Sequence, residues 1–393
     1  MFAILRKRRN PLIRIAAVMS AFWVAACDPN AMTGSGSGQR IDTSKPVPVA
    51  LLLPGGSGNS GDETLARSLK QAADLAISDL DGVKIDLRVY NTGASPDQAA
   101  AMATKAVDEG AKIILGPVFA QSANAVGRAV APRDVNVLSF SNNTSIAGGN
   151  VFVLGPTFEN TANRLVRYAA RTGKRNILVV HEQNTAGQAG AQAIQNAISG
   201  SGASLAGTMS YPFSQQGVIN AAGQIADRAK ADDVDAVFMT ADTAGALPLL
   251  SQLLPERGVD TSQKKFMGLT RWDIPQATLS LPGLQGGWFA TPDPNLNAQF
   301  RARYQAAFGE APSPISGLAY DGIAAIGALV KSGNPNALSK SGLTQRSGFV
   351  GVNGVFRLRS DGTNERGLAV AQVANGQVQV IDPAPRSFSG AGF

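Results

Sequence analysis

Small polar side chains gather directly after the apolar runs of this sequence, where they can hold a ligand by hydrogen bonds. The candidate ligand-binding residues at these positions are Ser57, Gln121, Ser122, Ser141, Asn142, Asn143, His181, Asn184, Asp242, Thr270 and Arg271. Several precede an expected helix, whose free N–H groups favour an anion such as a carboxylate. Small polar residues are also common as turn formers and helix caps. Their recurrence after six apolar runs favours a ligand cleft at the carboxyl ends of parallel strands.

The residue types of covalent and acid–base catalysis are scarce in this chain. His181 is the only histidine and Cys27 the only cysteine. A histidine can act as a general base near neutral pH, but it needs a nucleophile within reach, and no serine or cysteine nucleophile motif accompanies it. One histidine and one cysteine also leave too few ligands for a typical zinc site. We therefore predict a binding protein without catalytic residues, a metal or a cofactor, and not an enzyme.

A glycine-rich stretch offers an alternative to this interpretation. Residues 56–61 read Gly-Ser-Gly-Asn-Ser-Gly, which matches the dinucleotide-binding fingerprint between a strand and a helix. That fingerprint also needs an acidic residue near the end of the second strand, to bind the ribose hydroxyl. The expected second strand ends in Tyr90-Asn91-Thr92. The missing acid argues against a nicotinamide cofactor.

The N-terminal residues follow the order basic, apolar, small, cysteine. The apolar segment 15–23 is too short to span a bilayer comfortably, and Val24-Ala25-Ala26 precedes Cys27. The basic residues before it are Arg6, Lys7, Arg8, Arg9 and Arg14. This order resembles a bacterial lipoprotein signal, which implies cleavage before Cys27 and lipidation of that cysteine. An ordinary secretory leader with an incidental cysteine is the alternative.

The lipoprotein resemblance predicts where the protein works. It places the chain on the periplasmic side of a bacterial membrane, anchored by the lipid on Cys27. Asp28 follows the cysteine, and an aspartate there resembles a signal for retention in the inner membrane. Lipid chains, when two or more are present, hold a protein stably on a bilayer.

The charge of the chain is concentrated in this leader. Removing its five basic residues lowers the formal net charge from +7 to +2. No later run of lysine or arginine is long enough for a nucleic-acid surface, so we predict no nucleic-acid partner. Hydrophobic residues at 44% and charged residues at 16% are typical of a well-buried globular protein.

The apolar pattern after the leader alternates between strand and helix. Strands are expected at 47–53, 83–89, 112–115, 135–140, 176–180, 234–239 and 265–269, and residues 286–291 are expected to carry the chain back toward the first lobe. Helices are expected at 62–80, 96–109, 121–131, 158–172, 187–199, 218–231, 244–254, 295–308 and 315–332. Residues 348–382 read as strands with turns at Asp361-Gly362 and Asn375-Gly376. This order predicts parallel, doubly wound sheets with right-handed crossovers.

The length and the restart of this rhythm after Gly155-Pro156 predict two α/β lobes. Cleavage after residue 26 leaves 367 of the 393 residues, more than one ordinary core. Lobe 1 is expected at 47–155 plus 292–340, and lobe 2 at 156–291 plus 341–382. The Gly/Ser-rich segment 27–46 is expected to be a flexible tether, and 383–393 a loose tail.

Five short motifs carry a resemblance to a known family. Ile-Leu-Gly-Pro stands at 114–117, Val-Leu-Ser-Phe-Ser at 137–141, Asn-Thr-Ala-Gly-Gln at 184–188, Leu-Ala-Tyr-Asp at 318–321 and Gly-Val-Asn-Gly at 351–354. In this order and spacing, the chain from about 47 to 382 resembles the type I periplasmic binding proteins of the Leu/Ile/Val-binding group. The resemblance implies two lobes joined by three crossovers that close on a small ligand.

The resemblance also implies roles for individual residues. Gln121 and Ser122 would lie near a ligand carboxylate, with Ser141, Asn142 and Asn143 lining the same lobe. Thr270 or Arg271 would stand where the family has an acid that pairs with a ligand amino group. Here the nearby acid is Asp273, and Arg271 would repel an ammonium. A second departure is Ala186, where the family commonly places an aromatic residue.

Two functions remain open from the sequence. The first is a receptor for a small polar or amino-acid-like ligand that delivers it to an ABC permease. The second follows from residues 139–143 and 151–155, which look similar to lipoproteins called penicillin-binding-protein activators. In that alternative the protein is a regulatory lipoprotein that activates a peptidoglycan synthase.

Overall fold

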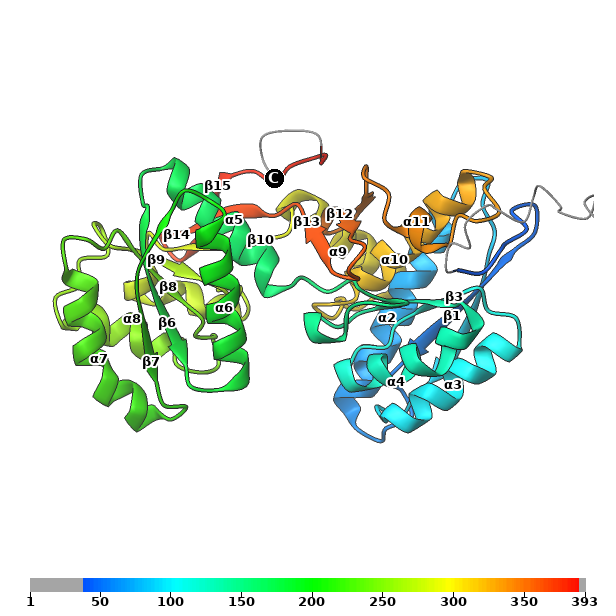
Figure 1. Ribbon diagram of the computed structural model, residues 1–393, viewed down its shortest axis with the longest axis horizontal. Helices are drawn as coiled ribbons and strands as arrows, with labels where there is room; N and C mark the ends of the chain where they lie inside the picture. Colours follow the sequence, from blue (N-terminus) through cyan, green and yellow to red (C-terminus); the bar gives the residue numbers. More distant parts are fainter. Residues whose placement is uncertain (1–37, 389–393) are drawn as a thin grey trace, which may run out of the picture. The chain divides into compact units, whose positions relative to one another are not determined.

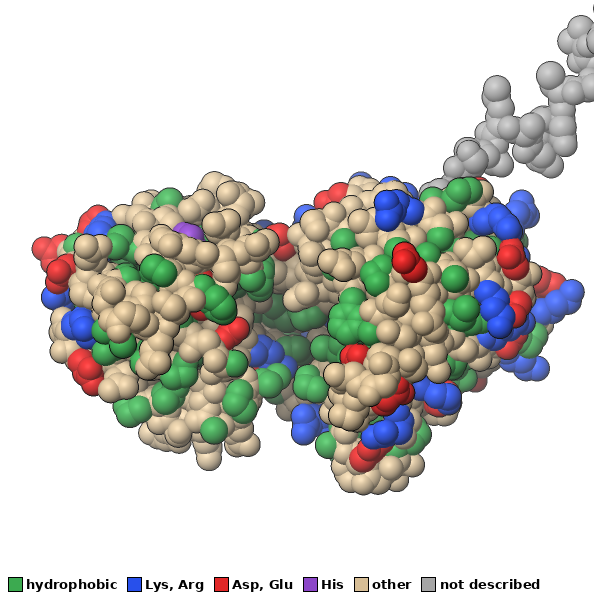
Figure 2. All heavy atoms as spheres, turned by 90° about the horizontal axis from the view of Figure 1, so that it is seen from below, with side chains coloured by type: hydrophobic (Ala, Val, Ile, Leu, Met, Phe, Trp, Pro, Cys, Tyr) green, Lys and Arg blue, Asp and Glu red, His purple; other side chains and the backbone are tan. Residues whose placement is uncertain are grey.

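The computed structural model describes residues 38–388 (Figure 1). Cys27, Asp28 and the leader lie outside the described residues. No helix in the described part is both long enough and apolar enough to cross a membrane. Figure 2 shows one face of the molecule, on which Lys and Arg side chains lie among Asp and Glu side chains. That face presents no broad surface of a single charge.

The first lobe is built on a five-stranded parallel sheet with the order β2-β1-β3-β4-β5. Its strands are β1 (Val47–Leu53), β2 (Ile85–Asn91), β3 (Ile113–Leu115), β4 (Asn136–Ser139) and β5 (Val151–Val153). Val49 and Leu51 of β1 join a core with α2 (Ser60–Ser78) and α10 (Gly317–Lys331). Ala50 and Leu52 join a separate core with α3 (Pro96–Asp108) and α4 (Ala120–Val130). Since successive side chains point to opposite faces, this continuous apolar strand is covered on both sides.

The second lobe is built on a seven-stranded sheet with the order β15-β14-β10-β9-β8-β6-β7. Its strands are β6 (Asn176–Glu182), β7 (Ser204–Tyr211), β8 (Ala236–Met239), β9 (Lys265–Gly268), β10 (Trp288–Thr291), β14 (Ala369–Ala374) and β15 (Gln377–Asp382). The first five are parallel, whereas β14 pairs antiparallel with β10, and β15 pairs antiparallel with β14. One face packs on α5 (Phe158–Arg171) and α6 (Thr185–Ser199), and the other on α7 (Gln215–Lys230) and α8 (Leu247–Glu256).

The parallel strands of the two lobes repeat one arrangement. The order β7-β6-β8-β9-β10 reproduces β2-β1-β3-β4-β5, and in both the direction of winding changes beside the first strand. Ligands bind at such switch points in open α/β sheets, beyond the carboxyl ends of the strands. The predicted fold class, two doubly wound parallel-sheet lobes, is confirmed.

A small third sheet corrects the predicted lobe boundary. It contains β11 (Phe349–Gly351), β12 (Gly354–Leu358) and β13 (Asn364–Arg366). Phe349, Phe356 and Leu358 are buried in the core of the first lobe, together with Leu343 of α11 (Lys340–Leu343). The assignment of 341–358 to lobe 2 is therefore wrong, because the hydrophobic side chains of this segment pack on lobe 1.

A buried polar network joins the segments that connect the lobes. Asp321 of α10 lies 3.1 Å from Arg366 of β13 and accepts a hydrogen bond from the Val352 N–H at 2.8 Å. Arg366 also donates to the carbonyl of Leu154, directly before the first crossover. Burial raises the pKa of Asp321, and the charge of Arg366 acts in the opposite direction. A Cβ on Gly351 would lie 2.0 Å from a carboxylate oxygen of Asp321, so this position requires glycine. The two late family motifs, 318–321 and 351–354, thus meet at one carboxylate.

Three further expectations differ from the structure. Strand β7 was not predicted, because it is an edge strand in which polar residues and a glycine interrupt the apolar pattern and only Tyr211 is fully buried. The tether prediction is wrong for Ile41, which is buried and whose N–H donates to the carbonyl of Pro335. The loose-tail prediction is wrong for the described tail residues Pro383 and Phe388. Pro383 accepts a hydrogen bond from Arg164, and Phe388 stacks beneath the guanidinium of Arg357.

Candidate ligand-binding site

The strand order of the first lobe brings three sets of predicted residues to one sheet edge. Ser57 follows β1, Gln121 and Ser122 follow β3, and residues 141–143 follow β4. Because β1, β3 and β4 are neighbours in a parallel sheet, their carboxyl ends lie side by side. The structure therefore groups these candidates on the first lobe.

The start of α4 is the part of this edge best suited to an anion. Its N-cap position is Phe119, which provides no capping hydrogen bond, so the first N–H groups of the helix have no intrahelical acceptor. Ser122 is 1% exposed, and its Oγ has no hydrogen-bond partner in the described structure. Gly116, with φ +94°, allows the preceding loop to approach β1, since a Cβ there would lie 2.3 Å from the Leu52 carbonyl. Free N–H groups and an unpaired hydroxyl fit a carboxylate.

The other candidates on this lobe hold their own loops. The Ser141 Oγ accepts a hydrogen bond from the Asn143 N–H at 3.1 Å, and the Asn143 side chain accepts one from the Ser145 N–H at 2.9 Å. The Asn142 side chain is exposed. The Ser57 hydroxyl donates to Asp62 at 2.9 Å. Ser57, Ser141 and Asn143 thus have structural partners that the sequence pattern did not reveal.

The glycine-rich stretch 56–61 uses its N–H groups internally. The carboxylate of Glu63 accepts a hydrogen bond from the Gly56 N–H at 2.6 Å. The side chain of Asn59 caps α2 by accepting from Gly61 and Asp62. A side-chain carboxylate and an amide therefore occupy donors that a pyrophosphate would need.

The second lobe groups its candidates in the same way. His181 is the next-to-last residue of β6, Asn184 follows that strand, Asp242 follows β8, and Thr270 and Arg271 follow β9. Strands β6, β8 and β9 are neighbours, so these side chains share one sheet edge.

His181 and Asn184 make local contacts at this edge. The Asn184 side chain caps α6 by accepting from the Gly187 N–H at 2.6 Å, and it donates to Glu182 at 2.8 Å. His181 Nδ1 lies 2.8 Å from the Glu182 carbonyl oxygen. These contacts position the loop after β6 and account for both residue types without a ligand.

Glu182 was missed among the candidates, although it directly follows His181. Its carboxylate is 9% exposed and accepts a hydrogen bond from the Tyr211 hydroxyl at 3.2 Å. It lines a cavity of about 350 Å³ together with Phe213 and Gly245. Burial, and then the charges of Glu182 and Asp242, raise the pKa of Tyr211. The carboxylates of Glu182 and Asp242 therefore both lie near Tyr211, at the tips of β6 and β8.

Arg271 does not present a free positive charge. Its Nε donates to Asp273 at 2.9 Å, and a second nitrogen pairs with the other carboxylate oxygen of Asp273. Thr270 donates to the Ala241 carbonyl at 3.4 Å. Asp273 neutralises the charge of Arg271. We therefore no longer expect this loop to repel the ammonium group of a ligand. Among the residues that the structure describes, no group of three His, Cys, Asp or Glu side chains is placed to hold a metal ion.

Solved structures with the same fold come from bacterial transport systems. One is a Rhodospirillum rubrum protein provisionally described as a branched-chain amino acid ABC transporter. It matches with a TM-score of 0.73 and 18% identity, and the match covers 86% of this chain and 100% of the R. rubrum chain. A branched-chain amino acid ABC transporter periplasmic ligand-binding protein from Burkholderia xenovorans LB400 has a TM-score of 0.68 at 17% identity, covering 86% and 94%. The ABC transporter solute-binding protein of Rhodopseudomonas palustris BisB5, in complex with 3,4-dihydroxy benzoic acid, has a TM-score of 0.60 at 18% identity, covering 88% and 99%. At these identities the likeness establishes the fold.

A curated relative is an uncharacterized protein of Rickettsia prowazekii (strain Madrid E), 23% identical over 236 residues. The match covers 58% of this chain and 62% of that relative, less than two thirds of its length. The closer resemblance to penicillin-binding-protein activators stays a prediction.

The family model described as periplasmic binding protein matches residues 46–377. The chain therefore belongs to the periplasmic binding protein family and has its type I fold.

Proposed function

We propose that this protein is the extracytoplasmic receptor of an ABC transporter and binds a small amino-acid-like solute between its lobes. The observation that carries the proposal is the opposite chemistry of the two sheet edges. The edge of lobe 1 offers unpaired donors at the start of α4, whereas the edge of lobe 2 offers the carboxylates of Asp242 and Glu182.

The donors of lobe 1 suit the carboxylate of such a solute. The N–H groups of Gln121 and Ser122 and the buried Ser122 hydroxyl lie at the switch point between β1 and β3. Branched-chain amino acids and 3,4-dihydroxy benzoic acid, which the names of two structural neighbours mention, both carry a carboxylate. We assign this shared group to lobe 1.

The acids of lobe 2 suit an amino group. Asp242 is exposed at the tip of β8, and Glu182 lies behind it against Tyr211. With Arg271 neutralised by Asp273, the acid that receives the ammonium is Asp242. The family acid expected near Thr270 is thus replaced by one on the neighbouring strand.

A thermal-shift screen of the purified chain tests the proposal. The panel contains amino acids, their amides and short peptides, with simple carboxylic acids that lack an amino group. A ligand at a hundredfold excess over its Kd adds about 2.7 kcal/mol to the free energy of unfolding, which raises the Tm by several degrees. We expect a response to one or more amino acids and a weaker response to the matching carboxylic acid.

A variant at the lobe 2 edge makes the test specific. Asp242→Asn is expected to abolish the preference for the amino group, while Asp232→Asn, an exposed acid at the other end of the same sheet, leaves it intact. No response to any member of the panel would refute a solute receptor. Copurification of a peptidoglycan synthase with the detergent-solubilised chain, without permease components, would favour the regulatory alternative.

The lipid anchor forms a separate part of the proposal, because Cys27 lies outside the described residues. We expect the processed N-terminus to be a lipid-modified Cys27, detectable by mass spectrometry of the membrane fraction. Cys27→Ser should release the protein into the soluble periplasmic fraction. A membrane-bound Cys27→Ser variant would exclude this anchor without affecting the assignment of the ligand site.

A further inference from the structure

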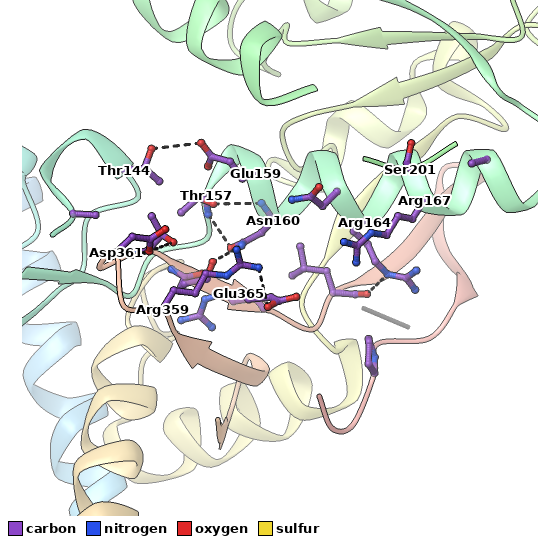
Figure 3. A pocket seen from close by; sticks show the side chains of 18 of the residues that line it. Thr144, Thr157, Glu159, Asn160, Arg164, Arg167, Ser201, Arg359, Asp361 and Glu365 are labelled. Atoms are coloured by element: carbon purple, nitrogen blue, oxygen red, sulfur yellow. Dashed lines mark hydrogen bonds and ion pairs between the residues drawn. The ribbon is translucent and has the colours of Figure 1, made fainter. Parts of the chain in front are cut away.

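A second hollow lies beside the segments that connect the lobes (Figure 3). Its volume is about 840 Å³, which falls within the range of about 300–1,000 Å³ that small-molecule sites occupy. Its walls come from α5, the β12–β13 hairpin, the loop before β5 and the end of α6. None of the candidate ligand-binding residues lines it.

One wall of this hollow is a row of arginines. Arg164, Arg167 and Arg171 follow one another on α5 at spacings of three and four, so they share one face of the helix. Arg175 continues the row beyond the helix end. We call these four residues the arginine row. In Figure 3, Arg164 and Arg167 lie at one end of the hollow, and Thr144, Glu159 and Asp361 lie at the other.

The arginine row carries more charge than its neighbours compensate. Arg164 and Arg171 share one carboxylate, that of Asp382, at 2.7 and 2.6 Å. The guanidinium groups of Arg167 and Arg175 have no acidic partner within 4.0 Å among the described residues. Four guanidinium groups therefore face one carboxylate, an excess of three positive charges. The remaining arginines of the lining are paired: Arg359 with Glu365 and Arg366 with Asp321.

The row is also fixed in place. Arg164 is 8% exposed, and its Nε donates to the Leu368 carbonyl at 2.6 Å. A second nitrogen of Arg164 donates to the Pro383 carbonyl at 3.1 Å. A buried, oriented guanidinium at the base and two at the rim without an acidic partner differ from arginines scattered over a solvated surface.

We propose that the arginine row binds a small polyanion that carries at least two phosphate or carboxylate groups. A planar guanidinium matches both groups with paired hydrogen bonds. Arg164 and Arg171 already share the Asp382 carboxylate, so Arg167 and Arg175, the two guanidinium groups of the row without an acidic partner, each need one anionic group from the ligand. Glu159 and Asp361 at the far end restrict the anionic part of the ligand to the arginine end. A soluble phosphate ester and a lipid phosphate share this chemistry.

Isothermal titration calorimetry of the purified chain at physiological salt tests the proposal. The soluble probes are inorganic tripolyphosphate and citrate, and cosedimentation with phosphatidylglycerol vesicles tests the lipid source. We expect at least tenfold weaker binding for the double variant Arg167→Gln/Arg175→Gln. The matched control is Arg301→Gln/Arg346→Gln, which removes two exposed arginines outside the hollow and should bind as the unmodified chain does.

The outcomes separate the sources and can overturn the site. Binding to soluble probes or to vesicles that only Arg167→Gln/Arg175→Gln weakens supports the proposal and identifies the source. Absence of binding to every probe, or equal weakening in the control, overturns it. Because Arg167 and Arg175 are exposed, the variant should keep the Tm of the unmodified chain, and Arg167→Lys should retain part of the affinity.

Discussion

The two lobes share one strand order but differ in the chemistry of their sheet edges. Both place five parallel strands in the same sequence around a switch point. At the edge of lobe 1, unpaired donors collect around Ser122, whereas carboxylates collect around Tyr211 at the edge of lobe 2. The repeated scaffold thus fixes where a ligand is held, and a few loop residues decide which of its ends each lobe receives.

The lobes also differ in how the returning chain completes them. Lobe 1 gains α10, β11 and β12, which add to its core, while lobe 2 gains two antiparallel strands, β14 and β15. Asp321 and Arg366 lie where these additions separate.

Asp321→Ala is expected to have the largest effect. It leaves the buried Arg366 without its carboxylate, and breaking a buried pair costs roughly 3–5 kcal/mol of stability. Urea unfolding followed by circular dichroism measures the loss. Fluorescence of Trp272 and Trp288, which both lie in lobe 2, reports whether damage in lobe 1 spreads across the connection.

The matched control is Asp108→Ala, which breaks an exposed pair with Arg133 and should cost less than about 1 kcal/mol. Similar losses in Asp108→Ala and Asp321→Ala would show that the buried pair is not the element that joins the lobes.

Asp242→Asn tests the acidic edge. A hydrogen bond to a charged group contributes about 1.5–3 kcal/mol, so the affinity for an amino-acid ligand should fall by roughly 10- to 150-fold. Calorimetry with the ligand found by the thermal-shift screen measures the change. Unchanged affinity would show that the ligand ammonium does not bind at the tip of β8. Asp232→Asn serves as the control within the lobe.

Ser122→Ala tests the donor edge and separates binding from stability. Because the Ser122 hydroxyl is buried without a partner, its removal should leave the unliganded protein as stable or up to about 1 kcal/mol more stable. Ligand affinity should fall about 10-fold, the lower end of the range for a hydrogen bond to a charged group.

Ser139→Ala provides the opposite case in the same lobe. The Ser139 hydroxyl is buried and donates to the Pro117 carbonyl at 3.0 Å, so its removal should lower stability by about 1 kcal/mol. If Ser122→Ala destabilised the unliganded chain as Ser139→Ala does, the Ser122 hydroxyl would have a structural role.

Glu365, on the hairpin beside the crossovers, should give the smallest effect. Burial acts to raise the pKa of Glu365, but hydrogen bonds from Arg357 and Arg359 outweigh burial and hold it below 4.5. At pH values between this lowered pKa and 4.5, the unfolded chain binds more protons than the folded chain. The stability of the fold therefore falls as the pH drops below 4.5 toward the folded pKa. The Tm between pH 5 and pH 3 should fall more steeply in the unmodified chain than in Glu365→Gln. Parallel curves would contradict the assignment.

The sequence predicted the parallel sheets because their strands are continuous apolar runs, such as Val47–Leu53, and their helices carry one apolar stripe. The edge strand Ser204–Tyr211 was not predicted. Most of its residues are exposed or only partly buried, so it lacks the continuous apolar run of the central strands. The short strands at 349–358 carry no local signal of which core they enter. Only the tertiary contacts of Phe349 and Phe356 assign them.

The candidate site was predictable in position and less so in detail. The sequence predicted which loop residues follow each strand, and the strand order of the structure brings those residues to two sheet edges. The pairing of Arg271 with Asp273 and the burial of Glu182 against Tyr211 depend on side-chain conformations. Sequence spacing does not specify such conformations.

The return of the chain's last strands to lobe 2 has a consequence for synthesis. Arg164 finds its acceptor at Leu368, 204 residues later, and β14 pairs with β10 only after that point. At about 5–20 residues per second, a ribosome needs roughly 10–40 s to supply these partners. Throughout that interval the growing chain lacks β14 as the partner of β10 and Leu368 as the acceptor for Arg164. Lobe 2 can therefore complete its sheet only when nearly all of the chain has been synthesised.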